Sequence, residues 1–295
     1  MERTYINEVQ KEIGSTVKVQ GFIENLRNSK YMAFIVLKDI TGKLQITVEK
    51  ADHPDLVDTI DKLTPDSVLT VTGKVMENDY VKMGGIEMIP ESIEIESIAD
   101  PLPIVRKEIA ATKKKKAVER SSIDQRIDYR WIDLRTDENQ LMFKAQSCFV
   151  NAMRKFLLDR NFIEIHTPKL IAAASESGSE VFKVDYFDRN AYLAQSPQFY
   201  KQMAMAAGFE RIFETGPVFR AEKSYTNKHS TEFSGFDLEF SYITSYKDVM
   251  KMEEELLTAG LQAVKDNYGD QIKEMFGQEV IVPTTPFPVV KLADL

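Results

Sequence analysis

The sequence predicts an α+β protein with two domains: a small N-terminal β-barrel, and then a domain of helices and antiparallel strands. Five short segments with alternating apolar residues fill roughly the first hundred positions, with one helical segment between the third and the fourth. A stiff break follows at residues 100–103, because each residue before a proline is disfavoured from helix. The rest of the chain mixes long amphipathic segments with short strands.

Composition fits a soluble protein of ordinary type. The chain has 295 residues, 43% hydrophobic and 28% charged, which is enough for two domains. Its net charge of −8 argues against a generally basic nucleic-acid binder but leaves a local basic patch open. The single cysteine, Cys148, excludes an internal disulfide. We expect a cytoplasmic protein, since the sequence shows no membrane-spanning apolar run and no signal peptide.

The first domain is expected to span residues 1–104, with a linker at 105–135 and the second domain at 136–295. Its strands are predicted at 16–22, 33–37, 44–48, 67–75 and 86–98, and its helix at 52–63. This order is typical of an OB-fold, a barrel that binds oligonucleotides. The pattern alone leaves another five-stranded barrel without a ligand equally open.

Three residues of the barrel suit RNA binding. Phe34 can stack on an unpaired base, Gln45 offers both a donor and an acceptor, and Glu87 can accept from a base amino group. The alternative for Phe34 is a place in the core, the commoner position of an isolated strand phenylalanine. His53 is expected to be an exposed loop residue.

Four consecutive lysines, Lys113–Lys116, lie in the predicted linker. Such a run is usually a solvated helix face, although here it could contact RNA phosphates. The sequence leaves these two alternatives open.

The second domain is predicted to begin with a helix at 140–160 that places Phe143, Val150, Met153 and Leu157 on one side. A short strand at 162–166 follows, and residues 190–240 are expected to form strand, loop, helix, strand, loop and strand. A further helix is predicted at 246–268, and residues 280–288 are expected to be extended.

The two strands around residue 228 are predicted to form a hairpin with one polar face. Arg220 and Glu222 alternate with apolar residues on the first strand, as Asp237 and Glu239 do on the second. A solvated sheet surface is the simpler interpretation of such a face. The basic loop at 223–230 and the interleaved acids and bases instead suit a charged, zwitterionic ligand.

Four segments resemble the class II aminoacyl-tRNA synthetases. FRAEKSYTNKHSTEF resembles motif 2, FIEIHTPKL resembles motif 1, and DYRWIDLR resembles the signature that opens the catalytic domain. AYLAQSPQFYKQ resembles the amino-acid-binding segment of the aspartyl-tRNA synthetases of archaea and eukaryotes. The resemblance covers almost the whole chain. It favours an OB-fold anticodon-binding domain in which Phe34, Gln45 and Glu87 match residues that read the central anticodon base.

The resemblance also implies an amino-acid site. Glu176 would hold the substrate ammonium, and Lys201 would pair with the side-chain carboxylate, with Ser196 and Gln198 in the same segment. Arg220 would bridge the α-carboxylate and the α-phosphate of ATP, which suits its planar fork of donors. Asparaginyl enzymes generally have Glu where Lys201 stands, so this lysine favours aspartate. A surface loop remains the alternative interpretation for Glu176.

The segment that resembles motif 2 implies an ATP site. Lys228 and His229 would reach the phosphates, Glu222 would accept from the adenine amino group, and Phe233 would stack on the ring. The full set of implied ATP-binding residues is Arg220, Ala221, Glu222, Lys228, His229, Ser230 and Phe233. Catalysis would depend on positioning and on charge neutralisation by Arg220 and Mg²⁺. No His or Cys spacing typical of zinc sites is present.

The function implied is that of an aspartate–tRNA ligase, which uses ATP to activate L-aspartate and transfers it to the 3′ end of tRNA(Asp). Charging of tRNA(Asn) is left open, and a homodimer with Pro168 at its interface is implied. An asparaginyl-type or lysyl-type ligase and a non-catalytic RNA-binding paralogue are the alternatives. Motif 3 and the family's Mg²⁺ ligands have no counterpart in the sequence. We therefore expect a C-terminally truncated catalytic domain that forms little aspartyl-adenylate alone.

Overall fold

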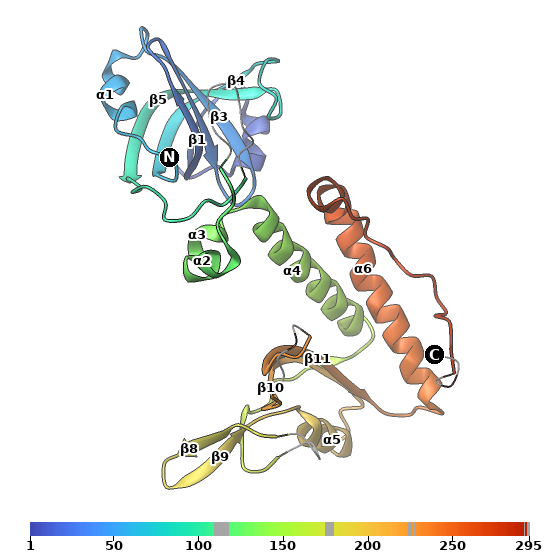
Figure 1. The fold of residues 1–295 in the computed structure, drawn as a ribbon. Coiled ribbons are helices and arrows are strands. Elements are labelled where there is room, and N and C mark those ends of the chain that lie inside the picture. The colour runs from blue at the N-terminus through green and yellow to red at the C-terminus, as the bar shows by residue number, and fades with distance from the viewer. Residues whose placement is uncertain (109–117, 175–179, 224–225, 227, 292, 294–295) are drawn as a thin grey trace. The chain divides into compact units, whose positions relative to one another are not determined.

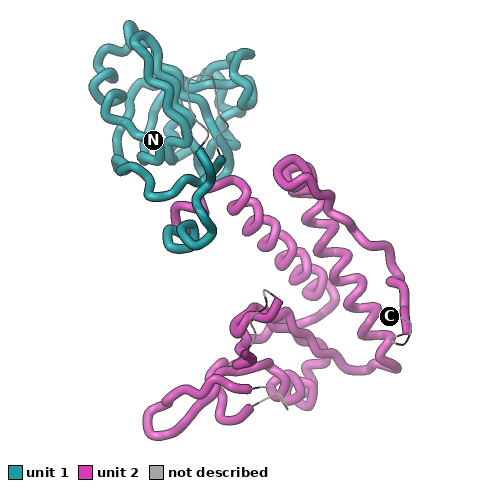
Figure 2. Tube along the Cα trace, in the orientation of Figure 1, with its two compact units in different colours: residues 1–129 teal, residues 130–295 magenta. Residues whose placement is uncertain are grey.

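The computed structural model describes residues 1–108, 118–174, 180–223, 226, 228–291 and 293 (Figure 1). The chain divides into two compact units, Met1–Tyr129 and Arg130–Leu295, shown separately coloured in Figure 2. This division falls inside the linker predicted at 105–135. The lysine run Lys113–Lys116 lies outside the described residues. Within the described ranges, no helix has both the length and the apolar character needed to cross a membrane.

The first unit is a closed five-stranded barrel with strand order β1-β2-β3-β5-β4. Its strands are β1 (Thr16–Asn28), β2 (Met32–Lys38), β3 (Lys43–Glu49), β4 (Val68–Glu77) and β5 (Ile86–Ser97). Its helices are η1 (Ile6–Glu12), η2 (Pro54–Leu56), α1 (Val57–Ile60) and α2 (Ile123–Asp128). The single helix predicted at 52–63 is thus two short pieces, η2 and α1.

Strict alternation along the strands builds the barrel core. In β2, Ala33, Ile35 and Leu37 are fully buried, whereas Phe34 between them lies on the outer face and is half-buried. β1 closes the barrel by pairing with β4 along its first half and with β2 along its second half. Gly21 lies at this change of partner, where a side chain would collide with the carbonyl oxygen of Lys38.

The second unit contains two small sheets and two long helices. Its helices are α3 (Arg130–Asp133), α4 (Asp137–Leu158), α5 (Gln198–Ala206) and α6 (Tyr246–Phe276). Its strands are β6 (Ile163–Glu164), β7 (Leu170–Ile171), β8 (Lys183–Tyr186), β9 (Arg189–Leu193), β10 (Arg211–Phe219) and β11 (Glu232–Phe240). One sheet has the order β11-β10-β6 and the other β7-β9-β8. The predicted α+β class is confirmed, although β6 pairs with β10 in parallel rather than antiparallel fashion.

The core of the second unit lies where α4 and α6 pack side by side and meet β10 (Figure 1). Met153, Leu157, Phe213 and Leu256 are among its buried members. Of the residues predicted on one side of α4, Met153 and Leu157 are buried, whereas Phe143 is 51% exposed. Helix α6 ends beyond the predicted residue 268, at a left-handed glycine, Gly277.

Candidate functional site

The polar face of the β10–β11 hairpin forms one wall of a small cavity. The register pairs Glu214 with Asp237 and Gly216 with Gly235. Alternate residues of a strand share a face, so the charged side chains of both strands converge on this side. The cavity has a volume of about 80 Å³, and its walls include Lys169, Ser196, Glu214, Arg220, Phe233 and Asp237.

Arg220 follows β10 directly and is held by a main-chain bond from its N–H to the carbonyl of Thr231, 2.9 Å long. The guanidinium carbon lies 5.6 Å from the centre of the Phe233 ring. The Nε atom is buried and has no hydrogen-bond partner among the described residues. A buried guanidinium N–H without a partner is costly, so this atom is suited to an anionic ligand.

Lys201 is the only buried residue of α5. Its ammonium donates to Asp237 and lies 3.2 Å from the Glu239 carboxylate. An ammonium has three N–H donors, and the described residues supply two carboxylate partners to it. Lys201 does not itself line the cavity. Its partner Asp237 does, together with Arg220, so the Lys201 ammonium contacts the cavity wall.

Two other predicted substrate residues lie at the start of α5. Ser196 is buried and lines the cavity. The main-chain N–H of Gln198 donates to the Ser196 hydroxyl at 3.3 Å, and Gln198 lies outside the cavity wall. Glu176 lies outside the described residues.

Most of the predicted ATP-binding residues lie on the exposed loop beyond Arg220. Ala221 donates its N–H to the carbonyl of Glu180 at 3.0 Å. The residues exposed and outside the cavity are Glu222, Lys228, His229 and Ser230. The Nδ1 atom of His229 lies 2.7 Å from the hydroxyl of Thr226. Of the predicted set, the structure brings only Arg220 and Phe233 together at the cavity.

Sequence reasoning missed a second ion pair in the cavity wall. The ammonium of Lys169 lies 2.8 Å from Glu214 Oε1, and Thr167 donates both its N–H and its hydroxyl to the same carboxylate. Burial alone would raise the pKa of Glu214, but the bonds from Lys169 and Thr167 outweigh it and lower the pKa overall. Strand alternation places Glu214 on the same face as Arg220, so this pattern could have predicted Glu214 as a residue of the site.

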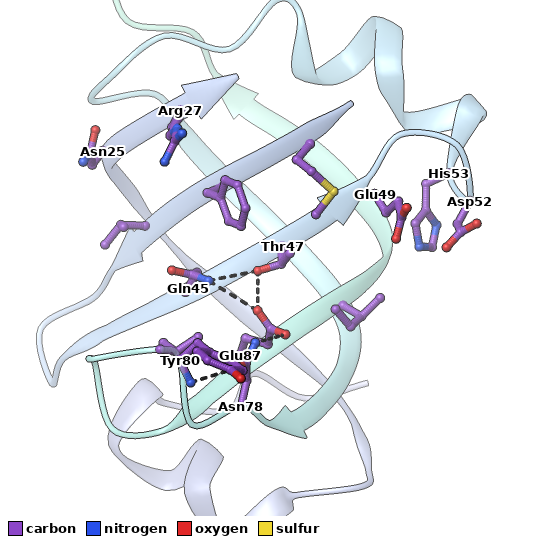
Figure 3. A pocket seen from close by; sticks show the side chains of 15 residues that line it. Asn25, Arg27, Gln45, Thr47, Glu49, Asp52, His53, Asn78, Tyr80 and Glu87 are labelled. Carbon is purple, nitrogen blue, oxygen red and sulfur yellow. Dashed lines mark hydrogen bonds between the residues drawn. The ribbon is translucent and has the colours of Figure 1, made fainter. Parts of the chain in front are cut away.

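The barrel carries a larger cavity of about 760 Å³ on its outer face (Figure 3). Phe34 lines it, with the Arg27 guanidinium 5.9 Å from its ring centre. The alternative of a core position for Phe34 does not hold, because the ring lies on the outer face. His53, expected in an exposed loop, is half-buried and lines the same cavity.

Gln45 and Glu87 face each other in this cavity on the paired strands β3 and β5 (Figure 3). The Gln45 amide lies 3.3 Å from the Glu87 carboxylate, which also accepts from the Thr47 hydroxyl and, at 2.7 Å, from the Asn78 amide. Glu87 is only 9% exposed, so this network fixes its carboxylate. Thr47 and Asn78 were missed, although alternation puts Thr47 on the face of Gln45.

Groups of three or more His, Cys, Asp or Glu side chains that could hold a metal ion do not occur among the residues described. The expectation that Mg²⁺ is bound elsewhere therefore stays a prediction.

Comparison with known proteins identifies the family. The family model for class II tRNA synthetases (D, K and N) matches residues 122–294, more than half of the chain. This chain belongs to the class II tRNA synthetases. The model for OB-fold nucleic acid binding domains matches residues 17–96, so both predicted parts of the fold are confirmed.

Curated relatives and solved structures agree on this synthetase family. The Aspartate–tRNA(Asp/Asn) ligase of Methanopyrus kandleri is 42% identical over 93% of this chain and 62% of its own length. The Aspartate–tRNA(Asp) ligase of Picrophilus torridus is 42% identical over 88% of this chain and 58% of its own. The chain thus spans about three fifths of the length of these relatives.

Two solved synthetases have the same fold. The asparaginyl-tRNA synthetase of Pyrococcus horikoshii with asparaginyl-adenylate has a TM-score of 0.84 and 29% identity, covering 94% of this chain and 62% of that one. The aspartyl-tRNA synthetase of Entamoeba histolytica has a TM-score of 0.77 and 30% identity, covering 95% and 59%. Fold similarity alone therefore does not choose between aspartate and asparagine.

Proposed function

We propose that this chain supplies the anticodon-binding barrel and part of the catalytic domain of an aspartate–tRNA ligase. The names of the curated relatives support aspartate as the substrate. The observation that carries the proposal is that Arg220 lines a cavity whose wall also holds Asp237, the carboxylate bound by the buried Lys201. Among the described residues, the buried Nε–H of Arg220 has no hydrogen-bond partner. The Lys201 ammonium lies behind Asp237, to which it donates.

Aspartate carries two carboxylates and one ammonium, so its pocket needs two cationic centres and an acid. Lys201 would take the side-chain carboxylate, and Arg220 the α-carboxylate. Asp237 and Glu239 would keep the Lys201 ammonium oriented. Glu176, outside the described residues, is proposed for the substrate ammonium, and Ser196 and Gln198 would bound the pocket.

The proposed reaction has two steps. An α-carboxylate oxygen of aspartate attacks the α-phosphorus of ATP, and the bond to pyrophosphate breaks. The terminal ribose hydroxyl of tRNA then attacks the aspartyl carbonyl, and AMP leaves. Arg220 would hold the α-carboxylate against the α-phosphate, so its contribution is positioning and charge neutralisation. Phe233 would stack on adenine, and Ala221, Glu222, Lys228, His229 and Ser230 would complete the ATP site.

Class II tRNA synthetases use ATP, and Mg²⁺ would accompany it. The described residues offer no cluster of acids for the ion, so no step is assigned to it. A homodimer, a cytoplasmic location and tRNA(Asn) as a second substrate also belong to the proposal. The relative named for both tRNA(Asp) and tRNA(Asn) supports the last of these.

The proposal is tested by the binding of tRNA to the 295-residue chain. A tRNA(Asp) transcript and one with a replaced central anticodon base are titrated at equal ionic strength, since salt governs such affinities. If Gln45 and Glu87 contact the central anticodon base, the unaltered transcript binds at least about tenfold more tightly, which is the usual effect of one mismatched base. Equal affinity for the two transcripts would contradict anticodon recognition.

A further inference from the structure

Three separate segments of the chain meet at the cavity of the second unit. The first segment, residues 167–169, lies directly before β7, and the second, residues 194–196, lies shortly before α5. The third runs from Glu214 to the end of β10 at Phe219 and includes the next residue, Arg220. Ser196 comes from the second segment and Arg220 from the third. Both side chains line the cavity, so the separation of their segments sets its width.

A closed ring of bonds joins the three segments. From β10, the Glu214 carboxylate accepts from Lys169 and Thr167. The Lys169 carbonyl accepts from the N–H of Ala194 at 2.9 Å. The Ala194 carbonyl in turn accepts from the N–H of Phe219, also at 2.9 Å and again on β10. The ring therefore closes on the strand where it began.

Arg220 and Ser196 both lie within two positions of a residue of this ring. Arg220 directly follows Phe219, and Ser196 lies two positions after Ala194. The only side chains that close the ring are those of Glu214, Lys169 and Thr167. The Glu214 side chain is 4% exposed and that of Lys169 is 23% exposed, so the pair is shielded from water.

We propose that Lys169 and Glu214 are positioning residues for the amino-acid pocket, acting through the main chain of Ala194 and Phe219 on Ser196 and Arg220. The proposal rests on the proposed function only in naming L-aspartate as the ligand. Arg220 is proposed to serve both ligands, whereas Ser196 is proposed to serve the amino acid alone. Loss of the ring should therefore weaken binding of the amino acid more than binding of ATP.

Lys169→Met removes the cation, and the double variant Lys169→Met/Glu214→Gln removes the buried charge that the single change would leave unpaired. Lys169→Arg is the conservative variant. The control is Glu164→Gln, which breaks the half-buried 3.0 Å pair with Arg154 in the same unit, neither residue being part of the cavity wall. Each 295-residue variant is titrated calorimetrically with L-aspartate and with ATP. Amide hydrogen exchange is followed at Ala194 and Phe219.

Both variants without the pair are expected to bind L-aspartate about tenfold more weakly and ATP less than about threefold more weakly, with Lys169→Arg restoring most of the loss. Exchange at Ala194 and Phe219 should accelerate in them but not in the control. Unchanged L-aspartate affinity, or unchanged exchange at both amides, would overturn the inference. If the wild-type chain binds neither ligand, the proposed function fails, and exchange at the two amides alone then decides whether the ring exists.

Discussion

Phe34 offers the barrel cavity one face of an aromatic ring, with the Arg27 guanidinium 5.9 Å from the ring centre. The proposed role is to stack on an unpaired base. Phe34→Ala should weaken tRNA binding by about 1–3 kcal/mol, the usual value of one base stacked on an aromatic residue. Filter binding with the tRNA(Asp) transcript measures this loss.

Tyr31→Ala is the matched control for Phe34. This tyrosine is 69% exposed and lies outside the cavity wall, so its loss should change the affinity for tRNA by less than about 0.5 kcal/mol. Equal effects of the two substitutions would show that general contact, rather than stacking in the cavity, accounts for the binding.

At the scale of secondary-structure elements, Glu214 ties β10 to the segment before β7. Its pKa is lowered in the folded state, so the stabilisation is complete above the ordinary carboxyl pKa of 4.5. It is lost as the pH falls through the lower folded-state value. Glu214→Gln should therefore flatten the acid side of the stability profile. Thermal unfolding of both proteins at about pH 7 and at steps down to about pH 3 tests this, and parallel profiles would contradict it.

Close packing of α4 against α6 requires a glycine at position 260. A Cβ there would lie 2.6 Å from the Phe149 ring and 3.1 Å from Met153 Cγ. The steric clash in Gly260→Ala should lower the free energy of unfolding by about 1–3 kcal/mol. The higher helix propensity of alanine offsets part of this loss. Gly269→Ala in the same helix meets only Lys265 Cγ at 3.6 Å, and should raise it by about 0.5–1 kcal/mol. Denaturant unfolding compares the two, and equal shifts would refute the packing argument.

At the scale of the whole molecule, the barrel has a core of its own. Its buried cluster runs from Ile6 to Ile93 and lies entirely within the first unit. A fragment of residues 1–129 should therefore fold alone and unfold cooperatively, which circular dichroism on heating would show. A fragment that lacks a cooperative transition would mean that the barrel depends on the second unit.

The sequence predicted features that depend on local alternation and on long motifs. The five barrel strands and the polar face that bears Asp237 are of this kind, whereas the sequence left the position of Phe34 open between the core and the outer face. It could not predict contacts set by tertiary packing, such as the bond from Lys201 to Asp237 or the pair of Lys169 with Glu214, 45 positions apart. The parallel pairing of β6 with β10 was missed because a two-residue strand carries almost no periodic signal.

The central claim is that the second unit selects a dicarboxylic amino acid through Lys201. Calorimetric titration of the 295-residue chain with L-aspartate and with L-asparagine, each in the presence of ATP, tests it most directly. We predict that L-aspartate binds at least about tenfold more tightly, since a charge-assisted hydrogen bond contributes about 1.5–3 kcal/mol, and that Lys201→Met abolishes the difference. Equal or tighter binding of L-asparagine by the unaltered chain would contradict the claim.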